Sequence, residues 1–374
     1  MSSIIFRSCW LFVCLVFSSC SYAANASYTK VPLGLPEVPI PKDNPQSAKK
    51  IQLGEKLFHD KRFSSTGKIS CATCHDPEKV FTDSPLRVSE GINKLTGTRN
   101  APTVVNAAYM KTQFWDGREP DLEGQSAGPF VNPVEMGLKN HKPILKIVSS
   151  DKEYVKLFKQ AFGVSAKKIR MKHVKQAIGS FERTIISANS DFDRFYFAGD
   201  NSALNDEEKR GFNVFLGQGR CVSCHTVSQT HALFTDNRFH NIGVGFKRIN
   251  KDVHELASAY RKAKKKGIDV DVEVLTNKNT SELGRFAVTT EFNNMGGFKT
   301  PTLRNIDKTA PYMHDGSIET LEDVVKFYNN GGRVKDTDPS FDFLSGGIRP
   351  LDLDDDQIDD LVAFLKALTS PEYK

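Results

Sequence analysis

Two short motifs place a pair of cysteines and a histidine at the same close spacing. The first motif is Cys71, Cys74 and His75, and the second is Cys221, Cys224 and His225. In such a C-x-x-C-H pattern the two thiols can add to the vinyl groups of one haem, and the histidine is held under the iron as its proximal ligand. A zinc half-site or a redox dithiol also uses C-x-x-C, but neither requires the terminal histidine present in both copies. The motifs therefore predict two covalent c-type haems, with His75 and His225 as iron ligands.

The remaining cysteines lie in an amino-terminal segment with the features of an export signal. Residues 1–23 contain a positive charge at Arg7, an apolar stretch and a small-residue cleavage site ending at Ala23. The apolar stretch is too short to span a membrane as a stable helix, so no transmembrane segment is expected. Lipoprotein processing at Cys20 is the alternative, although the preceding Phe17 is uncommon in a lipobox. Export to the periplasm or the cell surface fits the haem motifs, because c-type haem is attached outside the bacterial cytoplasm.

Length and composition are those of a soluble globular protein with two ordinary domains. The formal net charge of +6 is modest for 374 residues and gives no indication of nucleic-acid binding. A basic run from Arg261 to Lys266 supplies much of this excess, within a charged insertion at residues 250–280. We interpret the run as a solvated helix face, and docking of an acidic partner is the alternative.

Helices are expected to deliver the chain to each motif. Apolar residues between Ile51 and Phe58 predict a helix before the first motif, and a shorter helix around residues 211–215 precedes the second. Residues 76–146 contain many Gly, Pro and Asn, which favours ordered loops, and loops packed on a cofactor often carry chemistry. A final helix begins near Asp354 and has one apolar face.

The same plan therefore occurs twice, which predicts an all-α fold of two cytochrome c-like domains with one covalent haem each. Residues 199–202 have the composition of a domain boundary. We accordingly expect a signal at residues 1–23, an N-terminal domain at 24–200 and a C-terminal domain at 201–374.

The ligand opposite the histidine decides whether a haem transfers electrons or performs catalysis. The segment after Thr320 is predicted to be a helix, with Thr320 as its N-cap and Tyr328 on its buried face. A buried phenol oxygen needs a polar partner, which an iron or a backbone group can provide. From spacing alone a core tyrosine is favoured, and Met313 and Met295 compete as haem ligands.

Several stretches resemble the bacterial dihaem cytochrome c peroxidase family, which includes MauG. They are Arg99–Thr103, Gln113–Arg118, Val134–Met136, Gly284–Val288 and Lys299–Gly316. The resemblance covers nearly all of the chain after the signal, in matching order. It implies two cytochrome c-like domains, a peroxidatic haem, an electron-transfer haem and a calcium ion between them.

In the peroxidase branch of this family, a methionine fourteen residues beyond the histidine of a PY-x-H-x-G motif ligates the electron-transfer haem. That histidine resembles His314, which the family places at a haem propionate, and the ligand position is Tyr328. The MauG branch also has tyrosine there. The resemblance therefore implies a His225/Tyr328 haem, because an anionic phenolate stabilises Fe(III) and higher oxidation states whereas methionine favours Fe(II).

At the first haem, Glu135 resembles the distal acid–base carboxylate, Gln125 the neighbouring amide and Pro129 the residue over the haem face. Residues 86–98 contain no histidine, so an exchangeable loop ligand is not expected and the site should be open to peroxide. The family's calcium positions match a group of three residues, Asn100, Thr309 and Pro311.

Trp115 resembles the tryptophan that lies between the two haems, where it passes oxidising equivalents. MauG has a second tryptophan two residues before its second haem motif, whereas this chain has Gly219. The resemblance implies a peroxidase that uses hydrogen peroxide, in its MauG-like form to oxidise residues of a partner protein while both haems are oxidised above Fe(III). The alternatives are peroxide detoxification with electrons from a small cytochrome c or cupredoxin, and a non-catalytic dihaem electron carrier.

Overall fold

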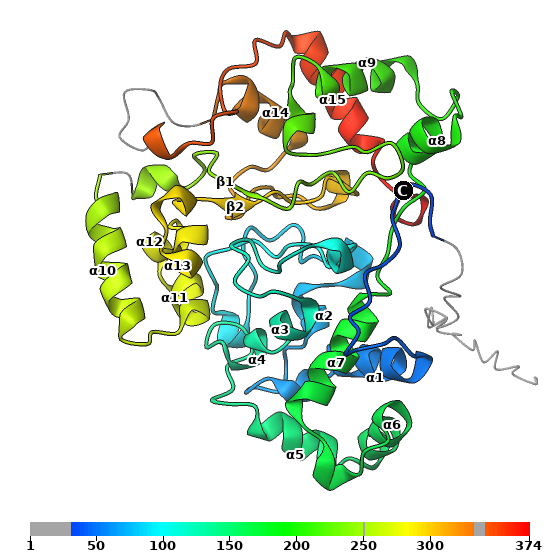
Figure 1. The fold of residues 1–374 in the computed structure, drawn as a ribbon, viewed down its shortest axis with the longest axis vertical. Helices are drawn as coiled ribbons and strands as arrows, with labels where there is room; N and C mark the ends of the chain where they lie inside the picture. Colours follow the sequence, from blue (N-terminus) through cyan, green and yellow to red (C-terminus); the bar gives the residue numbers. More distant parts are fainter. Residues whose placement is uncertain (1–30, 250, 333–340) are drawn as a thin grey trace, which may run out of the picture.

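The computed structural model describes residues 31–249, 251–332 and 341–374, and the predicted signal at residues 1–23 lies outside these ranges. The described chain is mostly helical (Figure 1). Its named strands are β1 (Phe239–His240) and β2 (Phe298–Lys299), which form one short antiparallel pair. The structure thus confirms the expected helical character of the fold, with very little sheet.

The N-terminal half contains seven α-helices around one cluster of buried apolar residues. They are α1 (Ala48–His59), α2 (Cys71–Cys74), α3 (Leu122–Gln125), α4 (Gly128–Val131), α5 (Lys142–Ser150), α6 (Lys152–Phe162) and α7 (Met171–Glu182). The helix predicted before the first motif is α1, which buries Ile51, Leu53, Leu57 and Phe58. Between α2 and α5 the chain runs through loops and short helical turns, as its Gly, Pro and Asn content predicts.

The C-terminal half builds a second apolar cluster and carries a helical insertion. The second cluster is formed by α8 (Asp191–Ala198), α9 (Asp206–Leu216), α14 (Leu321–Asn329) and α15 (Asp355–Lys366). The insertion consists of α10 (Val253–Lys265), α11 (Val270–Thr276), α12 (Lys278–Ser281) and α13 (Arg285–Thr289). In Figure 1 the insertion lies beside the junction of the two halves.

Both halves are built on the same close crossing of two helices. A Cβ atom on Gly54 of α1 would lie 1.9 Å from the carbonyl oxygen of Ala177 in α7. A Cβ atom on Gly211 of α9 would lie 1.8 Å from the carbonyl oxygen of Asp360 in α15. Each crossing therefore requires glycine, and the two crossings show that the structural plan is repeated within the chain.

The segment before α1 connects the two halves. Arg304 forms a buried two-bond ion pair with Asp193, at 2.8 Å for each bond, and donates to the carbonyl oxygen of Gly34 at 2.7 Å. Gly34 has a φ of +87°, and a Cβ atom there would meet the Asp193 carboxylate. Phe192 already packs in the second apolar cluster. The domain boundary near residue 200 remains a prediction.

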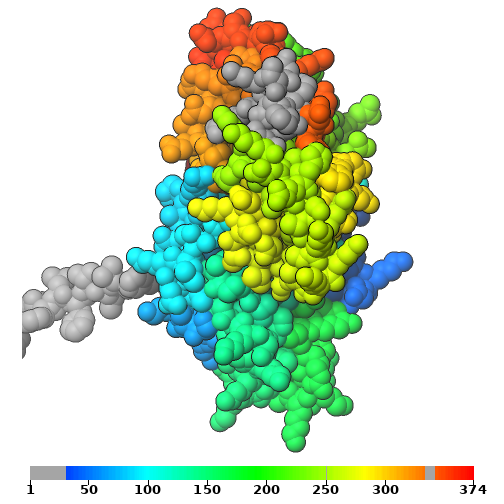
Figure 2. Space-filling model, turned by 90° about the vertical axis from the view of Figure 1, so that its left-hand side faces the viewer, coloured from blue at the N-terminus to red at the C-terminus, as the bar shows by residue number. Residues whose placement is uncertain are grey.

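The insertion is more ordered than its charged sequence indicates. Helix α10 buries Val253, Ala257 and Tyr260 on one face. In the basic run, Arg261 donates to the carbonyl oxygen of Thr290 at 3.1 Å, and Lys264 donates to that of Ala287 at 2.9 Å. These cations cap the C-terminal end of α13, so the prediction of a wholly solvated basic face is wrong for two of its members. In Figure 2 the yellow insertion covers the boundary between the halves.

Candidate functional site

The second motif opens onto a cavity of about 520 Å³, within the size range of cofactor pockets. Its walls include the whole motif and the candidate ligands on the opposite side: Cys221, Cys224, His225, Met313 and Tyr328. A three-residue helical turn, Cys221–Ser223, presents the motif. The cavity therefore brings together residues that the sequence separates by about a hundred positions, and they are the types that a covalent haem requires.

Both motif histidines are oriented by the same kind of hydrogen bond. His225 Nδ1 lies 2.8 Å from the carbonyl oxygen of Phe234, and His75 Nδ1 lies 3.2 Å from that of Phe81. Burial lowers the pKa of both imidazoles, which keeps them neutral. A neutral imidazole that donates from Nδ1 leaves Nε2 as the acceptor that an iron needs. Both sites thus fit a haem with histidine as proximal ligand.

The motif cysteines are unpaired in the described chain, and burial favours the neutral thiol in three of them. All four are free cysteines in the described chain. Burial raises the pKa of Cys74 and of Cys221 to about 12, and it also raises that of Cys71. Free thiols at this spacing are available for addition to the vinyl groups of a haem.

Helix α14 presents Tyr328 to the second motif as predicted. Thr320 caps the helix by accepting a hydrogen bond from the Asp323 amide at 3.0 Å. Tyr328 is the second-last residue of the helix and lines the cavity. The Tyr328 phenol makes no hydrogen bond to any described residue, and burial raises its pKa. A neutral phenol is thus the default, and a cationic iron is what would favour the phenolate.

The two methionine candidates lie in different places, and only one of them lines the cavity. Met313 lines the same cavity as Tyr328. Met295 is 2% exposed and packs among apolar residues of the insertion, away from the cavity wall. Tyr328 and Met313 therefore remain as ligand candidates, and the Met295 alternative is wrong because its side chain belongs to another cluster.

Glu135 lies close enough to the first motif for its charge to raise the pKa of Cys71 and Cys74. Its Oε2 atom is buried without a hydrogen-bond partner in the described chain. Burial, with a smaller contribution from Asp271, raises the pKa of Glu135 to about 8, against the opposing charge of Arg118. An unpaired carboxyl that titrates near neutral pH can both take up and release a proton.

The two other residues expected around the first haem lie on the short helices before Glu135. Gln125 ends α3, and Pro129 is the second residue of α4. Both are half-buried. The main-chain carbonyl of Pro129 accepts a hydrogen bond from the Met136 amide at 3.2 Å, which ties α4 to the loop that carries Glu135.

The predicted calcium residues come from both halves and line one wall of the cavity. The Asn100 side-chain nitrogen donates to the carbonyl of Arg87 at 3.2 Å, which leaves its amide oxygen without a partner among the described residues. The carbonyl oxygens of Thr309 and Pro311 likewise accept no hydrogen bond within the described ranges. Three hard oxygen donors of this kind fit a calcium ion, whose other ligands would be water.

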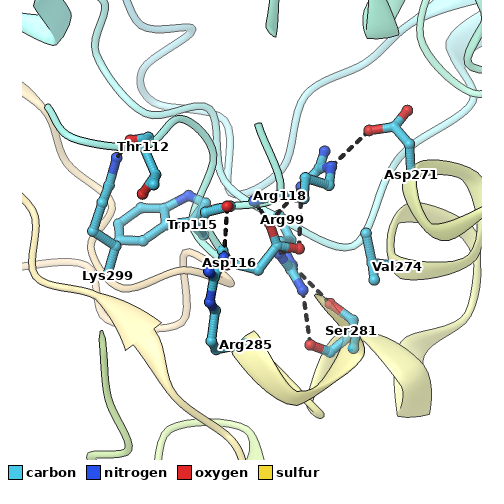
Figure 3. Close-up of polar contacts among 12 residues, drawn as sticks. Arg99, Thr112, Trp115, Asp116, Arg118, Asp271, Val274, Ser281, Arg285 and Lys299 are labelled. Atoms are coloured by element: carbon cyan, nitrogen blue, oxygen red, sulfur yellow. Dashed lines mark hydrogen bonds and ion pairs between the residues drawn. The ribbon is translucent and has the colours of Figure 1, made fainter. Parts of the chain in front are cut away.

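Trp115 lies between the two halves. Its indole nitrogen donates to the Asn100 carbonyl at 2.9 Å, and its own carbonyl accepts from the Lys299 amide at 2.7 Å. Figure 3 shows Trp115 beside Lys299. His314 also lines the cavity, stacked on Phe298 with ring centroids 3.6 Å apart. Its Nε2 lies 3.0 Å from the carboxylate of Glu282, so a contact with a haem propionate stays a prediction for this residue.

A buried ion-pair network holds the loop that carries Trp115. Asp116 lies 2.8 Å from Arg99 and 3.1 Å from Arg118, and Arg118 lies 2.7 Å from Asp271 of α11 (Figure 3). Burial alone would raise the pKa of Asp116, but the two guanidinium groups lower it to about 2. Arg285 of α13 donates to the Asp116 carbonyl at 3.0 Å. The insertion thus clamps the segment between the two halves.

Comparison with known proteins identifies the family. A family model described as di-haem cytochrome c peroxidase matches residues 48–202. The methylamine utilization protein MauG of Methylorubrum extorquens is 35% identical over 333 residues, which cover 88% of this chain and 81% of that protein. This chain belongs to the di-haem cytochrome c peroxidase family. The cytochrome c551 peroxidase of Nitrosomonas europaea is also 35% identical, over 91% of this chain and 86% of that protein.

A solved structure of a MauG-like protein associated with microbial copper homeostasis has the same fold. It superimposes with a TM-score of 0.73 at 31% sequence identity, covering 92% of this chain and 98% of that one. As a member of the di-haem cytochrome c peroxidase family, the protein is a peroxidase, and the family implies two c-type haems. Among the described residues, no helix has the length and apolarity needed to cross a membrane.

One departure from MauG has a structural cause in this di-haem peroxidase. Gly219 donates from its amide to the carbonyl oxygen of Val214, and a Cβ atom on Gly219 would lie 2.8 Å from that oxygen. A tryptophan cannot replace this glycine unless the turn before Cys221 changes shape. The chain therefore has glycine at the position where the resemblance to MauG leads to a tryptophan.

Sequence reasoning did not single out two cavity residues. His240 lies within 4.8 Å of Cys224 and Asp236, and its Nε2 is 2.8 Å from the Asp236 carboxylate. Lys299 is half-buried beside Trp115 and donates to the Thr112 carbonyl at 2.6 Å (Figure 3). The four-residue spacing of Asp236 and His240 was the one available signal, but it occurs outside a helix.

Proposed function

We propose that this peroxidase is an exported enzyme that accepts hydrogen peroxide at the His75 site and oxidises residues of a partner protein through the His225/Tyr328 site. The observation that carries this MauG-like assignment is the Tyr328 phenol, which faces the second motif with no other partner in the described chain. Export is supported by the signal-like residues 1–23 and by the haem motifs.

Bound haem supplies the iron that binds peroxide and exchanges electrons with the donor. Glu135 would take a proton from one peroxide oxygen and return it to the leaving oxygen, since its pKa lies near neutral pH. Gln125 would orient the same substrate through its side-chain amide, and Pro129 would limit access over the haem face. These groups suit a small polar peroxide that needs proton transfer rather than a large specificity pocket.

Trp115 is the proposed contact between the two sites. It lines the second cavity, and its indole is bonded to Asn100, one of the proposed calcium residues. A calcium ion held by Asn100, Thr309 and Pro311 would fix the two halves on either side of this indole, because its donors come from both. Rigid spacing would keep electron transfer between the sites efficient.

Detoxification of peroxide is the second candidate function, with electrons from a small cytochrome c or cupredoxin. Two observations favour it. Met313 shares the cavity with Tyr328, and Gly219 has no room for the tryptophan through which MauG reaches its protein substrate. The similarity to a MauG-like protein associated with copper homeostasis supports a copper-binding partner as the donor to test.

The ligand of the second haem tests the assignment. The wild-type protein is expected to show a six-coordinate, low-spin His/Tyr spectrum, and Tyr328→Met should convert it to His/Met and raise the haem potential, because a thioether favours Fe(II). Met313→Leu is the matched control and should leave the spectrum unchanged. A sulfur-to-iron charge-transfer band in the wild type that Met313→Leu removes would show methionine ligation and leave the detoxification function.

A further inference from the structure

The last residue of α7 is a buried carboxyl group without a partner. Glu182 is 4% exposed, and its Oε2 atom makes no hydrogen bond within the described chain. The neighbouring Arg183 does not neutralise it, because that guanidinium makes two hydrogen bonds of 2.7 Å to Glu123 of α3. A buried carboxyl left unpaired is costly in its charged form, so its position calls for a reason.

The repeated helix crossing supplies the position of Glu182 relative to the first motif. A Cβ atom on Gly54 would meet Phe181 Cβ at 2.8 Å, and a Cβ atom on Gly211 would meet Phe364 Cβ at the same distance. Phe181 of α7 and Phe364 of α15 are therefore equivalent residues in the two halves. In each half the glycine meets a carbonyl oxygen of the facing helix, at Ala177 or Asp360, and the phenylalanine comes four residues later in that helix.

The residue after each phenylalanine is then equivalent as well, which pairs Glu182 with Leu365. Leu365 lines the cavity of the second motif. By this equivalence Glu182 faces the first motif, and an independent observation agrees: the charge of Glu182 contributes to the raised pKa of Cys71. The first site thus has a carboxyl group at a place where the second site has an aliphatic side chain.

We propose that Glu182 is the proton-holding group of the first haem site, so that one-electron reduction there is accompanied by uptake of one proton onto the Glu182 carboxylate. The inference rests on the proposed function in that it requires a haem at Cys71, Cys74 and His75. The electron comes from the donor protein and the proton from solvent. Removing one positive charge from the iron removes the attraction that kept the nearby carboxylate ionised.

The charged groups near Glu182 determine how the potential of the first haem depends on pH. Burial raises the pKa of Glu182 to about 8, Arg183 lowers it and Glu123 raises it. The charge of Glu135 also raises the pKa of Cys71, so this second carboxyl group lies near the same motif. Ferric iron lowers the pKa of Glu182 relative to ferrous iron, so the potential of the first haem falls as pH rises between the two pKa values and is flat outside them.

The experiment is a spectropotentiometric titration of the intact dihaem protein from about pH 6 to pH 10. The potential of the first haem should change with a slope approaching one proton per electron in the wild type. In Glu182→Gln and Glu182→Leu the potential of the first haem should no longer depend on pH. The leucine variant also reproduces the side chain found at this position in the second site. The second haem, which has Leu365 at this position, should be unaffected in all variants.

Two controls test whether Glu182 rather than Glu135 takes up the proton, and a haem count tests the proposed function separately. Glu135→Gln should keep the slope; a slope lost in that variant and retained in Glu182→Gln would overturn the inference in favour of Glu135. Reduced-minus-oxidised infrared spectra should gain a protonated-carboxyl band in the wild type and lack it in Glu182→Gln. Mass spectrometry must first show two haems, because a haem-free first motif would contradict the proposed function, whereas two haems with an unchanged slope in Glu182→Gln would contradict only this inference.

Discussion

At the scale of single residues, Glu135 offers the sharpest test of the peroxide site. Glu135→Gln keeps the shape but removes the base, so we expect the reaction with peroxide to slow by roughly 10²–10⁴-fold while both haems stay attached. The wild-type rate should also fall as pH drops below the pKa of about 8, and the variant should lose this dependence. Stopped-flow mixing with peroxide measures both effects.

The exposed carboxylate Glu153, which pairs with Lys56 on the surface, provides the matched control for this variant. Glu153→Gln should react with peroxide at the wild-type rate. If Glu135→Gln also reacts with peroxide at the wild-type rate, the Glu135 carboxyl takes no part in the reaction. The burial of Glu135 without a hydrogen-bond partner would then need another explanation.

The sequence alone could place Tyr328 but not Glu182. The position of Tyr328 could be predicted because it depends only on the periodicity and the N-cap of one helix. Helix α14 begins at the predicted N-cap and has the predicted periodicity. Glu182 lacks a partner because Arg183 turns to Glu123, and its nearness to Cys71 depends on the crossing of α1 and α7. No local pattern encodes those contacts.

At the scale of elements, the insertion shows where sequence reasoning reached its limit. The basic run was interpreted from charge alone, whereas Lys264 and Arg261 are directed to the carbonyl end of α13. That arrangement depends on the side of α10 packing against the C-terminal end of α13, which a sequence pattern does not show. The same insertion supplies Asp271 and Arg285 to the loop around Asp116, so it supports the segment that carries Trp115.

The Asp116 network is expected to stabilise this junction strongly. Asp116→Asn would leave Arg99 buried without its counter-charge and Arg118 paired with Asp271 alone. Removing one partner of a buried ion pair costs about 3–5 kcal/mol. In the wild type this stabilisation is present above the ordinary carboxyl pKa near 4 and is lost as pH falls through the folded-state pKa of about 2. Denaturant unfolding at several pH values measures both effects.

A surface ion pair serves as the control for Asp116→Asn. Replacing Glu153, the exposed partner of Lys56, should change the unfolding free energy little, because solvent screens that pair. An equally small effect for Asp116→Asn would show that the buried ion-pair network around Asp116 does not stabilise the junction.

The proposed calcium site belongs to the same scale, since its ligand residues come from loops of both halves. Chelation should remove the link among Asn100, Thr309 and Pro311, uncouple the two haems and reduce turnover with peroxide. Asn100→Ala removes one donor and should weaken calcium binding measured by calorimetry. Full activity in a sample verified as calcium-free would argue against an ion between the halves.

At the scale of the whole molecule, the chain uses one helical plan twice and gives the copies different chemistry. The glycine crossings of α1 with α7 and of α9 with α15 are nearly superimposable in their contacts. The motif histidines are oriented by the same backbone hydrogen bond in both. Unpaired carboxyl groups lie near the first motif, whereas a phenol and a thioether face the second. The repeated plan was visible in the sequence, but this division of side chains required the structure.

The two sites should therefore load haem independently. Mass spectrometry of the exported protein is expected to show two covalent haems, because each motif supplies its own pair of thiols and its own oriented histidine. The double variants Cys71→Ala/Cys74→Ala and Cys221→Ala/Cys224→Ala form a matched pair, and each should lose one haem and keep the other. Only the first should lose the direct reaction with peroxide, since Glu135 lies near the first motif. Zinc in place of haem, or loss of both haems from either variant, would contradict two independent covalent sites.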